Sequence, residues 1–145
     1  MLKKGASNEI GHSRGGASTK IHAIVDSYGY PVYFMISEGQ RNDINYAIPL
    51  LDHIEIDGSK VLADRGYDSN QLIDYIYDHG GEPTIPSRRG AKFERRCDWW
   101  FYKERHLVEN YFLKLKAFRR IATRYDKLAF TYLGFLCIVS ILIWL

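Results

Sequence analysis

The sequence predicts a single α/β domain over residues 1–145, and three observations support this prediction. Short β-rich runs alternate with segments of helical periodicity, which is the pattern of an α/β fold. The 145 residues suffice for one domain with a sizeable core. The composition is that of a globular protein, with 46% hydrophobic and 26% charged residues and no internal repeat.

The first third of the chain predicts a loop, a strand hairpin and a helix. Residues 1–16 are polar and contain glycine without periodicity, so we expect a loop or a mobile tail. Two β-rich runs at 19–26 and 31–37 flank a Ser-Tyr-Gly-Tyr turn, which predicts a hairpin. Residues 43–53 have apolar side chains at helical spacing, and Asp43 is the expected N-cap.

The middle of the chain predicts two strands around a second helix. Residues 60–63 form a short apolar strand that stops at Asp64. After a turn, Asp68 or Ser69 is expected to cap a helix that ends before a pair of glycines. Residues 82–86 predict a short strand, limited by two prolines.

A basic loop at 87–98 leads into a long predicted helix from Trp99 to about Arg120. Within it, residues 102–116 contain no Gly or Pro and are rich in Leu, Lys and Glu, which favour a helix. Apolar side chains gather on one face and polar side chains on the opposite face. The polar stripe consists of Tyr102, Arg105, Glu109 and Lys116. Taken alone, such a stripe indicates a solvated face with charge pairs between residues four apart.

The last segment, 128–145, is uncharged and mostly apolar. By length alone it is a marginal candidate for a transmembrane helix. It also contains Thr131, Gly134 and Ser140, which suit a helix packed inside a domain. The residues alone therefore leave a buried helix and a membrane helix as alternatives.

The net charge of the chain is small, but its basic residues are clustered. The formal net charge of +3 is mild, so bulk charge alone does not indicate a nucleic-acid-binding protein. The basic residues fall into two clusters. The first contains Arg88, Arg89, Lys92, Arg95 and Arg96, and the second contains Lys114, Lys116, Arg119, Arg120 and Arg124.

The cysteines and histidines show no metal-ligand pattern. Cys97 and Cys137 form neither a zinc-type motif nor a disulfide framework, and the five histidines have no ligand spacing. Free cysteines indicate a reducing compartment, and the N-terminal residues contain no apolar signal region. We therefore expect a cytoplasmic protein.

The spacing of the polar stripe, Tyr-x2-Arg-x3-Glu-x6-Lys, resembles the signature of the DDE transposases of bacterial insertion sequences. Further segments resemble the insertion-sequence-five group, and they occur in the same order along nearly the whole chain. These segments are 11–16, 19–22, 38–43, 62–68 and 118–125.

The resemblance implies a ribonuclease-H-like fold, a mixed sheet flanked by helices, with 128–145 as a buried helix. In that fold the first strand is central and carries the first catalytic Asp, and no segment before Thr19 can serve as this strand. We therefore expect a truncated catalytic domain, with 1–16 flexible and 99–145 forming the C-terminal helices. A gap or a distorted pairing should separate the hairpin from the strand before Asp64.

The resemblance also implies that Asp64 and Glu109 are catalytic residues and metal ligands. A strand-end Asp is otherwise an ordinary turn residue, and the resemblance favours catalysis. DDE chemistry uses carboxylates that converge on two divalent cations, and oxygen ligands suit Mg²⁺. We expect the two carboxyl groups to lie within about 8 Å of each other. The third carboxylate is not apparent, because the hairpin turn explains Asp26 and the N-cap explains Asp43.

DNA contacts are expected from the stripe and from both basic clusters. Arg105 would hold phosphate through a bidentate fork and Lys116 as a point charge, while Tyr102 orients a phosphate or simply packs. The other expected DNA-binding residues are Arg88, Arg89, Arg95, Arg96, Arg119 and Arg120. Trp99 and Trp100 either stack on a flipped base or anchor the start of the long helix, and the second interpretation is favoured.

The predicted function is that of the carboxyl-terminal part of a transposase, which cleaves element ends and joins DNA strands by metal-dependent phosphoryl transfer. Without the first catalytic Asp, we expect the chain to be inactive alone and to need the upstream transposase segment or another transposase copy. It would be a truncated gene product or the downstream frame of a frameshifted gene. The alternatives are a non-catalytic DNA-binding or regulatory remnant and a small membrane-associated protein anchored by 128–145.

Overall fold

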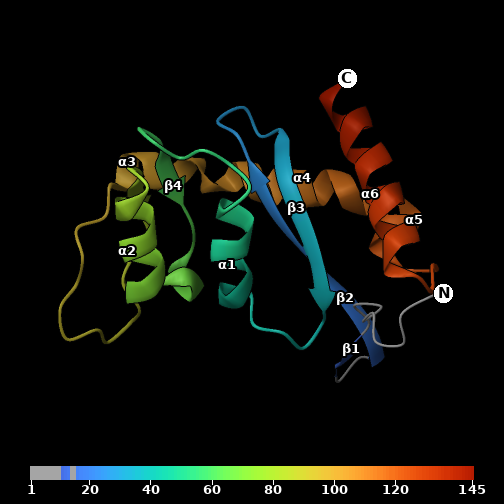
Figure 1. The fold of residues 1–145 in the computed structure, drawn as a ribbon, viewed down its shortest axis with the longest axis horizontal. Helices are drawn as coiled ribbons and strands as arrows, with labels where there is room; N and C mark the ends of the chain where they lie inside the picture. The colour runs from blue at the N-terminus through green and yellow to red at the C-terminus, as the bar shows by residue number, and fades with distance from the viewer. Residues whose placement is uncertain (1–10, 14–15) are drawn as a thin grey trace.

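The computed structural model describes residues 11–13 and 16–145, which form two separate sheets (Figure 1). The first sheet has three antiparallel strands in the order β1-β2-β3, and the second has two parallel strands, β4 and β5. The strands are β1 (Gly11–Ser13), β2 (Gly16–Val25), β3 (Pro31–Glu38), β4 (Lys60–Leu62) and β5 (Glu82–Thr84). Within the described residues no strand pairing joins the two sheets, which agrees with the gap expected between the hairpin and the strand before Asp64.

The predicted N-terminal loop contains a strand. Gly11–Ser13 pairs antiparallel with the start of β2, and Gly11 lies opposite Ser18. The loop prediction is wrong for these residues because the backbone of a polar, glycine-containing segment can still form ladder hydrogen bonds along a strand edge. Residues 1–10 and 14–15, which the same prediction covered, lie outside the described residues.

The β2–β3 hairpin confirms the predicted pair of strands. The carboxylate of Asp26 closes its turn by accepting hydrogen bonds from the backbone N–H of Tyr28 at 2.9 Å and of Tyr30 at 3.0 Å. Gly29 lies in this turn with a φ of +85°, a left-handed conformation that glycine adopts at little cost. The turn residues therefore account for Asp26, as the sequence predicted.

The first core lies between the β4–β5 sheet and the helices α1 (Ile44–Leu51) and α2 (Asn70–Asp78). Both helices occur where the sequence predicted them. This core is aliphatic, and apolar positions at helical spacing on α1 and α2 supply most of it. Its buried members are Ala47, Leu51, Ile56, Leu72, Ile73, Ile76 and Ile85.

Neither predicted N-cap side chain caps its helix. Asp43 precedes α1 without a side-chain cap hydrogen bond, and its carboxylate lies 2.9 Å from Lys20 Nζ. Ser69 precedes α2 without such a bond, and the Asp68 carboxylate accepts a hydrogen bond from the backbone N–H of Arg88 at 2.7 Å. Asp43 and Ser69 thus occupy the predicted N-cap positions but make no side-chain capping hydrogen bond. The Asp43 and Asp68 carboxylates instead have partners 23 and 20 residues away, which a local pattern does not reveal.

The predicted helix from 99 to 120 is divided into segments. These are α3 (Trp99–Tyr102), the 3₁₀ turn η2 (Lys103–Arg105), α4 (His106–Lys116) and α5 (Arg119–Ala122). Between α4 and α5, Phe118 has an extended backbone with φ −93° and ψ 110°, and its side chain packs against the core beside α4. The prediction of one continuous helix is therefore wrong beyond Lys116, because burial of Phe118 turns the chain.

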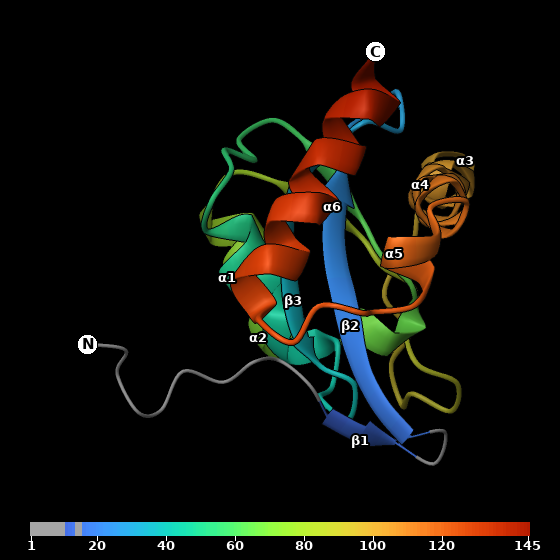
Figure 2. The same cartoon turned by 90° about the vertical axis from the view of Figure 1, so that its right-hand side faces the viewer.

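The second core lies between the β2–β3 hairpin and the helices α4, α5 and α6 (Ala129–Trp144) (Figure 2). Its buried members are Tyr111, Leu115, Ile121, Tyr132, Leu136 and Val139. The hydroxyl oxygens of Tyr111 and Ser140 lie 2.8 Å apart, and the Tyr132 hydroxyl donates to the Ile121 carbonyl at 3.0 Å. The terminal segment is a helix that packs on this core, as predicted, but only one of its faces is buried. The prediction of a buried helix is wrong for the other face, where Phe130, Ile138 and Ile141 are exposed. None of the described helices is long and apolar enough to cross a membrane.

Two long-range contacts attach α6 and the segment before it to the hairpin. The Trp144 ring stacks on Tyr30 with centroids 4.6 Å apart, and its Nε1 donates to the Pro31 carbonyl at 2.9 Å. The Arg124 guanidinium donates to Thr19 Oγ1 at 2.7 Å. These hydrogen bonds join residues that are 113 and 105 positions apart in the sequence.

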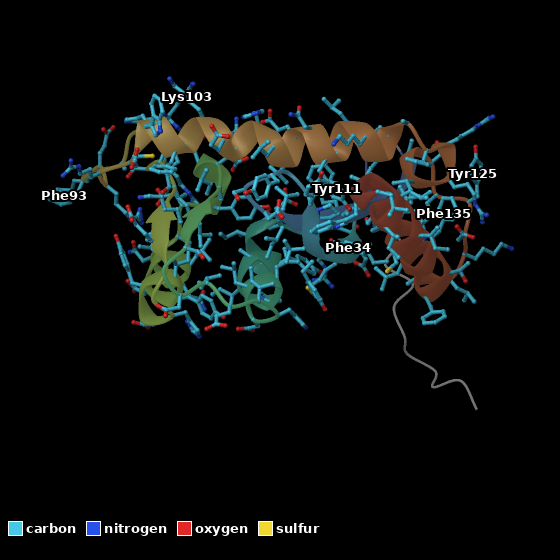
Figure 3. All side chains as sticks on the ribbon, turned by 90° about the horizontal axis from the view of Figure 1, so that it is seen from above. Phe34, Phe93, Lys103, Tyr111, Tyr125 and Phe135 are labelled. Carbon is cyan, nitrogen blue, oxygen red and sulfur yellow. The ribbon has the colours of Figure 1, made fainter. Side chains whose placement is uncertain are left out.

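Helices bridge the two sheets where strands do not. The α3–α4 segment crosses from one sheet to the other, since α3 contacts β5 and α4 contacts β2 (Figures 1 and 3). On the opposite side of β2, α1 contacts the hairpin, α2 and the 3₁₀ turn η1 (Arg65–Tyr67) (Figure 2). The relative placement of the two sheets therefore depends on helix packing.

Candidate functional site

Asp64 lies just beyond the carboxyl end of β4, where α/β proteins gather their ligand-binding groups. Its side chain is exposed, and Oδ1 accepts a hydrogen bond from the backbone N–H of Gly66 at 2.8 Å. A Cβ at position 66 would lie only 2.9 Å from this oxygen, so glycine allows the turn to fold closely around the carboxylate. The turn thus fixes one carboxylate oxygen of Asp64 at the surface.

Tyr67 follows Asp64 in the same turn, and the charges of two carboxylates, Asp64 and Asp43, act on its hydroxyl group. Burial raises the pKa of Tyr67 to about 12, and the negative charges of Asp43 and Asp64 act in the same direction. The phenol is therefore neutral at physiological pH, and it lies within electrostatic reach of both carboxylates. Asp43, which the sequence explains as an N-cap, precedes α1, and α1 contacts the 3₁₀ turn η1 that follows Asp64.

Asp43 belongs to a network that reaches across β2. Its carboxylate lies 2.9 Å from Lys20 Nζ and 3.9 Å from His22 Nδ1. His22 is buried, stacks on Tyr46 with centroids 4.3 Å apart, and has its Nε2 2.7 Å from Ser37 Oγ. Burial lowers the pKa of His22, an effect that Asp43 opposes and Lys20 reinforces. Sequence reasoning missed this network because its members lie 15 to 23 residues apart and form no local motif.

The polar stripe on the long helix is present. Glu109 Oε1 lies 3.0 Å from the Arg105 guanidinium, which in turn lies 5.4 Å from the centroid of the Tyr102 ring. Lys116 stands on the last turn of α4, at the edge of a cavity of about 210 Å³ that Thr19 also lines. Glu109 and Lys116 are exposed on α4, and Tyr102 and Arg105 before it are half-buried. Tyr111 points from α4 toward the sheet (Figure 3), so the predicted division into two faces is confirmed for α4.

Asp64 and Glu109 stand on different elements and have separate partners. Asp64 contacts its own turn, Glu109 contacts Arg105, and α4 packs against β2 and α6. Their expected separation of about 8 Å stays a prediction. In the part of the chain that the structure describes, no group of three or more His, Cys, Asp or Glu side chains could hold a metal ion. The carboxylates have the donor chemistry that Mg²⁺ prefers, but their number falls short of a complete site.

The basic loop contains one half-buried arginine, Arg95, and three exposed arginines. The Arg95 guanidinium pairs with Asp68 and donates to Asn70 Oδ1 at 3.0 Å, so it holds the loop against the start of α2. The side chains of Arg88, Arg89 and Arg96 are exposed. Arg95 therefore has a structural contact, and the remaining arginines are the ones whose charge is open to a DNA backbone.

Arg119 and Arg120 also have partners within the chain. Arg119 Nε donates to the Tyr125 hydroxyl at 3.1 Å. The Arg120 guanidinium donates to Asp126 Oδ1 at 2.9 Å and lies 4.8 Å from the centroid of the Phe135 ring. Both residues remain exposed, so their role in DNA binding stays a prediction alongside these contacts.

The two tryptophans do not anchor the long helix by burial. Trp99 is 54% exposed and Trp100 is 76% exposed. The Asp98 carboxylate caps α3 instead, since it accepts hydrogen bonds from the backbone N–H of Trp100 at 3.2 Å and of Phe101 at 3.4 Å. The interpretation that the tryptophans anchor the start of the long helix is therefore wrong for Trp100, because Asp98 caps the helix instead.

Comparison with known proteins gives a family match over almost the whole chain. Residues 3–144 match the family model described as "Transposase DDE domain". The chain is 35% identical to the "Putative transposase for insertion sequence element IS6501" of Brucella ovis, over 88% of this chain and 98% of the relative. It is 31% identical to the "Putative transposase for insertion sequence element IS402" of Burkholderia cepacia, over 85% of this chain but only 61% of that relative. No solved structure matches the chain.

Proposed function

Because this chain belongs to the DDE transposase family of insertion sequences, we propose that it forms the carboxyl-terminal part of a DNA strand-transfer site that includes Asp64 and Glu109. Transposases of this family act on DNA and are generally metal-dependent. The observation that carries the assignment is Asp64, an exposed carboxylate fixed by its own turn at the carboxyl end of β4. We expect the protein to act in the cytoplasm.

The side chains around Glu109 suit the binding of DNA phosphate. Arg105 presents a planar fork that can hold two phosphate oxygens, and Lys116 supplies a point charge farther along α4. Asp64 and Glu109 would hold Mg²⁺, which supplies activation of the attacking oxygen and stabilisation of the leaving oxygen when it is bound. Two carboxylates do not make a complete two-metal site.

The third carboxylate is proposed to come from a strand that stands between the two sheets. In the described residues, β1 covers the edge of β2 only at Gly16–Ser18, and β4 pairs only with β5. The remaining edges of β2 and β4 can each accept a further strand. A strand in this position would complete one mixed, ribonuclease-H-like sheet, and its side chains would lie beside Asp64. The upstream transposase segment or another transposase copy would supply it.

The test is a cleavage assay on element-end DNA with Mg²⁺. We expect the 145-residue chain alone to leave the DNA intact, and we expect cleavage when the upstream transposase segment is added, fused or as a separate polypeptide. Asp64→Asn and Glu109→Gln should each abolish this cleavage, because each removes an ionised ligand at nearly constant volume. Glu104→Gln is the matched control, since it changes an exposed carboxylate on the same helical segment.

Two results would contradict the proposal. Cleavage that survives Asp64→Asn would remove Asp64 from the site. Cleavage by the chain alone, abolished by Asp64→Asn, would show that the third carboxylate lies within this chain. If neither mixture cleaves while DNA binding persists, the protein is a non-catalytic DNA-binding remnant.

A further inference from the structure

The start of the long helix carries an exposed aromatic surface that the proposed chemistry does not use. The four residues of α3 are all aromatic, and Trp99, Trp100 and Phe101 are exposed. Phe93, in the preceding loop, is 81% exposed. Large aromatic side chains normally contribute buried area, and a contiguous exposed group of them marks a binding surface. We call Phe93, Trp99 and Trp100 the aromatic platform.

A lysine lies near two of the three aromatic rings of the platform, those of Trp100 and Phe93. Lys103 Nζ lies 5.8 Å from the centroid of a Trp100 ring, and Lys92 Nζ lies 5.8 Å from the Phe93 centroid. Figure 3 shows Phe93 and Lys103 at one end of the molecule, away from Tyr111 and Phe34 in the second core. The platform therefore combines flat apolar faces with positive charges that also remain exposed.

Folding does not explain the exposure of Trp100. Asp98 caps α3, so the indole is not needed to hold the helix start. Trp99 meets the Tyr102 ring edge-on, with centroids 5.4 Å apart. The Arg105 guanidinium lies over the same Tyr102 ring, 5.4 Å from its centroid. The platform thus continues directly into the stripe that is expected to hold DNA phosphate.

Exposed aromatic faces next to cations have the chemistry that recognises unpaired bases. A base stacks on an aromatic ring regardless of its identity, while neighbouring Lys or Arg side chains hold the backbone phosphates. In a duplex both faces of each base are already stacked, so only single-stranded or frayed DNA can use such a surface. The cations disfavour a purely apolar protein partner, which would leave their charges without compensation.

We propose that Trp100, with Trp99 next to it in α3 and Phe93 on the preceding loop at the same end of the molecule (Figure 3), is a stacking platform for unpaired bases of single-stranded DNA, and that Lys103 and Lys92 hold the adjoining phosphates. The proposal rests on the proposed function only in taking DNA as the substrate. It adds that the strand next to the site is bound in an unpaired form.

The test compares the affinity of the purified full chain for a labelled oligothymidylate and for a duplex of equal length, in EDTA. Trp100→Ala should weaken single-strand binding by about tenfold, because one base–aromatic stack is lost. Binding to the duplex should stay within about twofold, and Trp100→Phe should retain most of the single-strand affinity because it keeps a stacking face. The salt dependence should be unchanged in Trp100→Ala, since stacking releases no counterions.

Two further variants separate stacking from charge and from general surface effects. Lys103→Gln should make the slope of log affinity against log salt concentration shallower by about 0.7, the value for one phosphate contact on a single strand. Phe130→Ala removes an aromatic side chain that is 87% exposed on α6 and should change nothing.

Equal single-strand affinity in the wild type and Trp100→Ala would overturn the proposal, as would an equal loss on single strand and duplex. A change in oligomeric state without a change in DNA affinity would assign the surface to a protein partner instead, and would also overturn it. EDTA excludes metal-dependent cleavage, so this binding assay does not depend on the catalytic carboxylates. Failure of the cleavage assay therefore leaves this result standing, and failure here leaves the cleavage result standing.

Discussion

The two cores of this molecule differ in the side chains that they bury. The first core is aliphatic and is held by α1 and α2 against the parallel strands β4 and β5. The second core buries two tyrosines, Tyr111 and Tyr132, whose hydroxyl groups find partners on α6 and α5. An aliphatic core needs mainly the right volume, whereas a core with buried hydroxyl groups also needs matched hydrogen-bond partners.

This difference matters for the proposed site because each carboxylate belongs to a different core. Asp64 follows β4 and is positioned by the first core, while Glu109 stands on α4, which packs on the second core. No strand pairing joins the two halves within the described residues. The distance between the carboxylates therefore depends on the bridging helices, and it is the part of the site most sensitive to what fills the space between the sheets.

The largest expected loss of stability comes from truncating one fully buried side chain in either core. Leu136 and Ile76 are both fully buried, one in each core. Leu136→Ala and Ile76→Ala should each lower the free energy of unfolding by about 3 kcal/mol, through lost burial and a residual cavity. Amide hydrogen exchange should show that Leu136→Ala exposes β2, β3 and α4 while α2 stays protected, and that Ile76→Ala does the reverse.

Uniform loss of protection in both variants would contradict this picture, because it would mean that the two cores unfold as one cooperative unit. Ile141→Ala, on the exposed side of α6, is the control and should leave the exchange pattern unchanged.

A smaller loss of stability should follow from removing a buried hydrogen bond, which only the second core is expected to depend on. Tyr111→Phe leaves the buried Ser140 hydroxyl without its partner and should cost about 1–3 kcal/mol of stability. Adding Ser140→Ala should recover part of that loss, because no polar group is then left unpaired. Urea unfolding of the two single variants and the double variant gives the coupling energy. Strict additivity would show that the hydrogen bond contributes nothing specific.

The smallest expected effect is a pH dependence that belongs to His22. Its pKa in the folded state is lowered by burial from the usual 6.5, so the unfolded chain takes up a proton more readily. The stability that neutral His22 supports is present above about pH 6.5 and is lost as the pH falls below it. Urea unfolding between neutral and mildly acidic pH should show a steeper decline in the wild type than in His22→Gln. His106→Gln, at an exposed histidine, is the matched control, and an unchanged slope in His22→Gln would contradict the assignment.

The sequence predicted most of the elements because their signals are local. The alternating runs of β2 and β3, the glycine turn between them, and the apolar spacing of α1, α2 and α4 all occur within short windows. The separation between hairpin and β4 was also expected, on the basis of a family resemblance. Single-sequence patterns alone do not specify which strands lie next to each other.

Predictions from the sequence failed where a side chain has a partner that a local pattern does not include. Asp43 and Asp68 have the sequence context of helix caps, but Lys20 and the basic loop bind their carboxylates. Trp100 has the sequence context of an anchor, but Asp98 caps the helix and leaves the indole exposed. In each case a local rule was overridden by an interaction that the rule does not consider, and the same limit leaves the Asp64–Glu109 distance a prediction.

The contacts of α6 have a consequence for how the protein is made. Trp144 and Arg124 attach α6 and the segment before it to Pro31 and Thr19, so the second core closes only when contacts across more than 100 positions form. Because the hairpin precedes α6 in the sequence, a nascent chain carries the hairpin with one apolar face uncovered until α6 has been synthesised. Aggregation during synthesis competes with folding throughout that interval. Loss of the final turn of α6 would remove the contacts of Trp144 with Tyr30 and Pro31 but keep the buried Tyr132, Leu136 and Val139, so the middle of α6 covers the hairpin and the final turn attaches the helix to the hairpin.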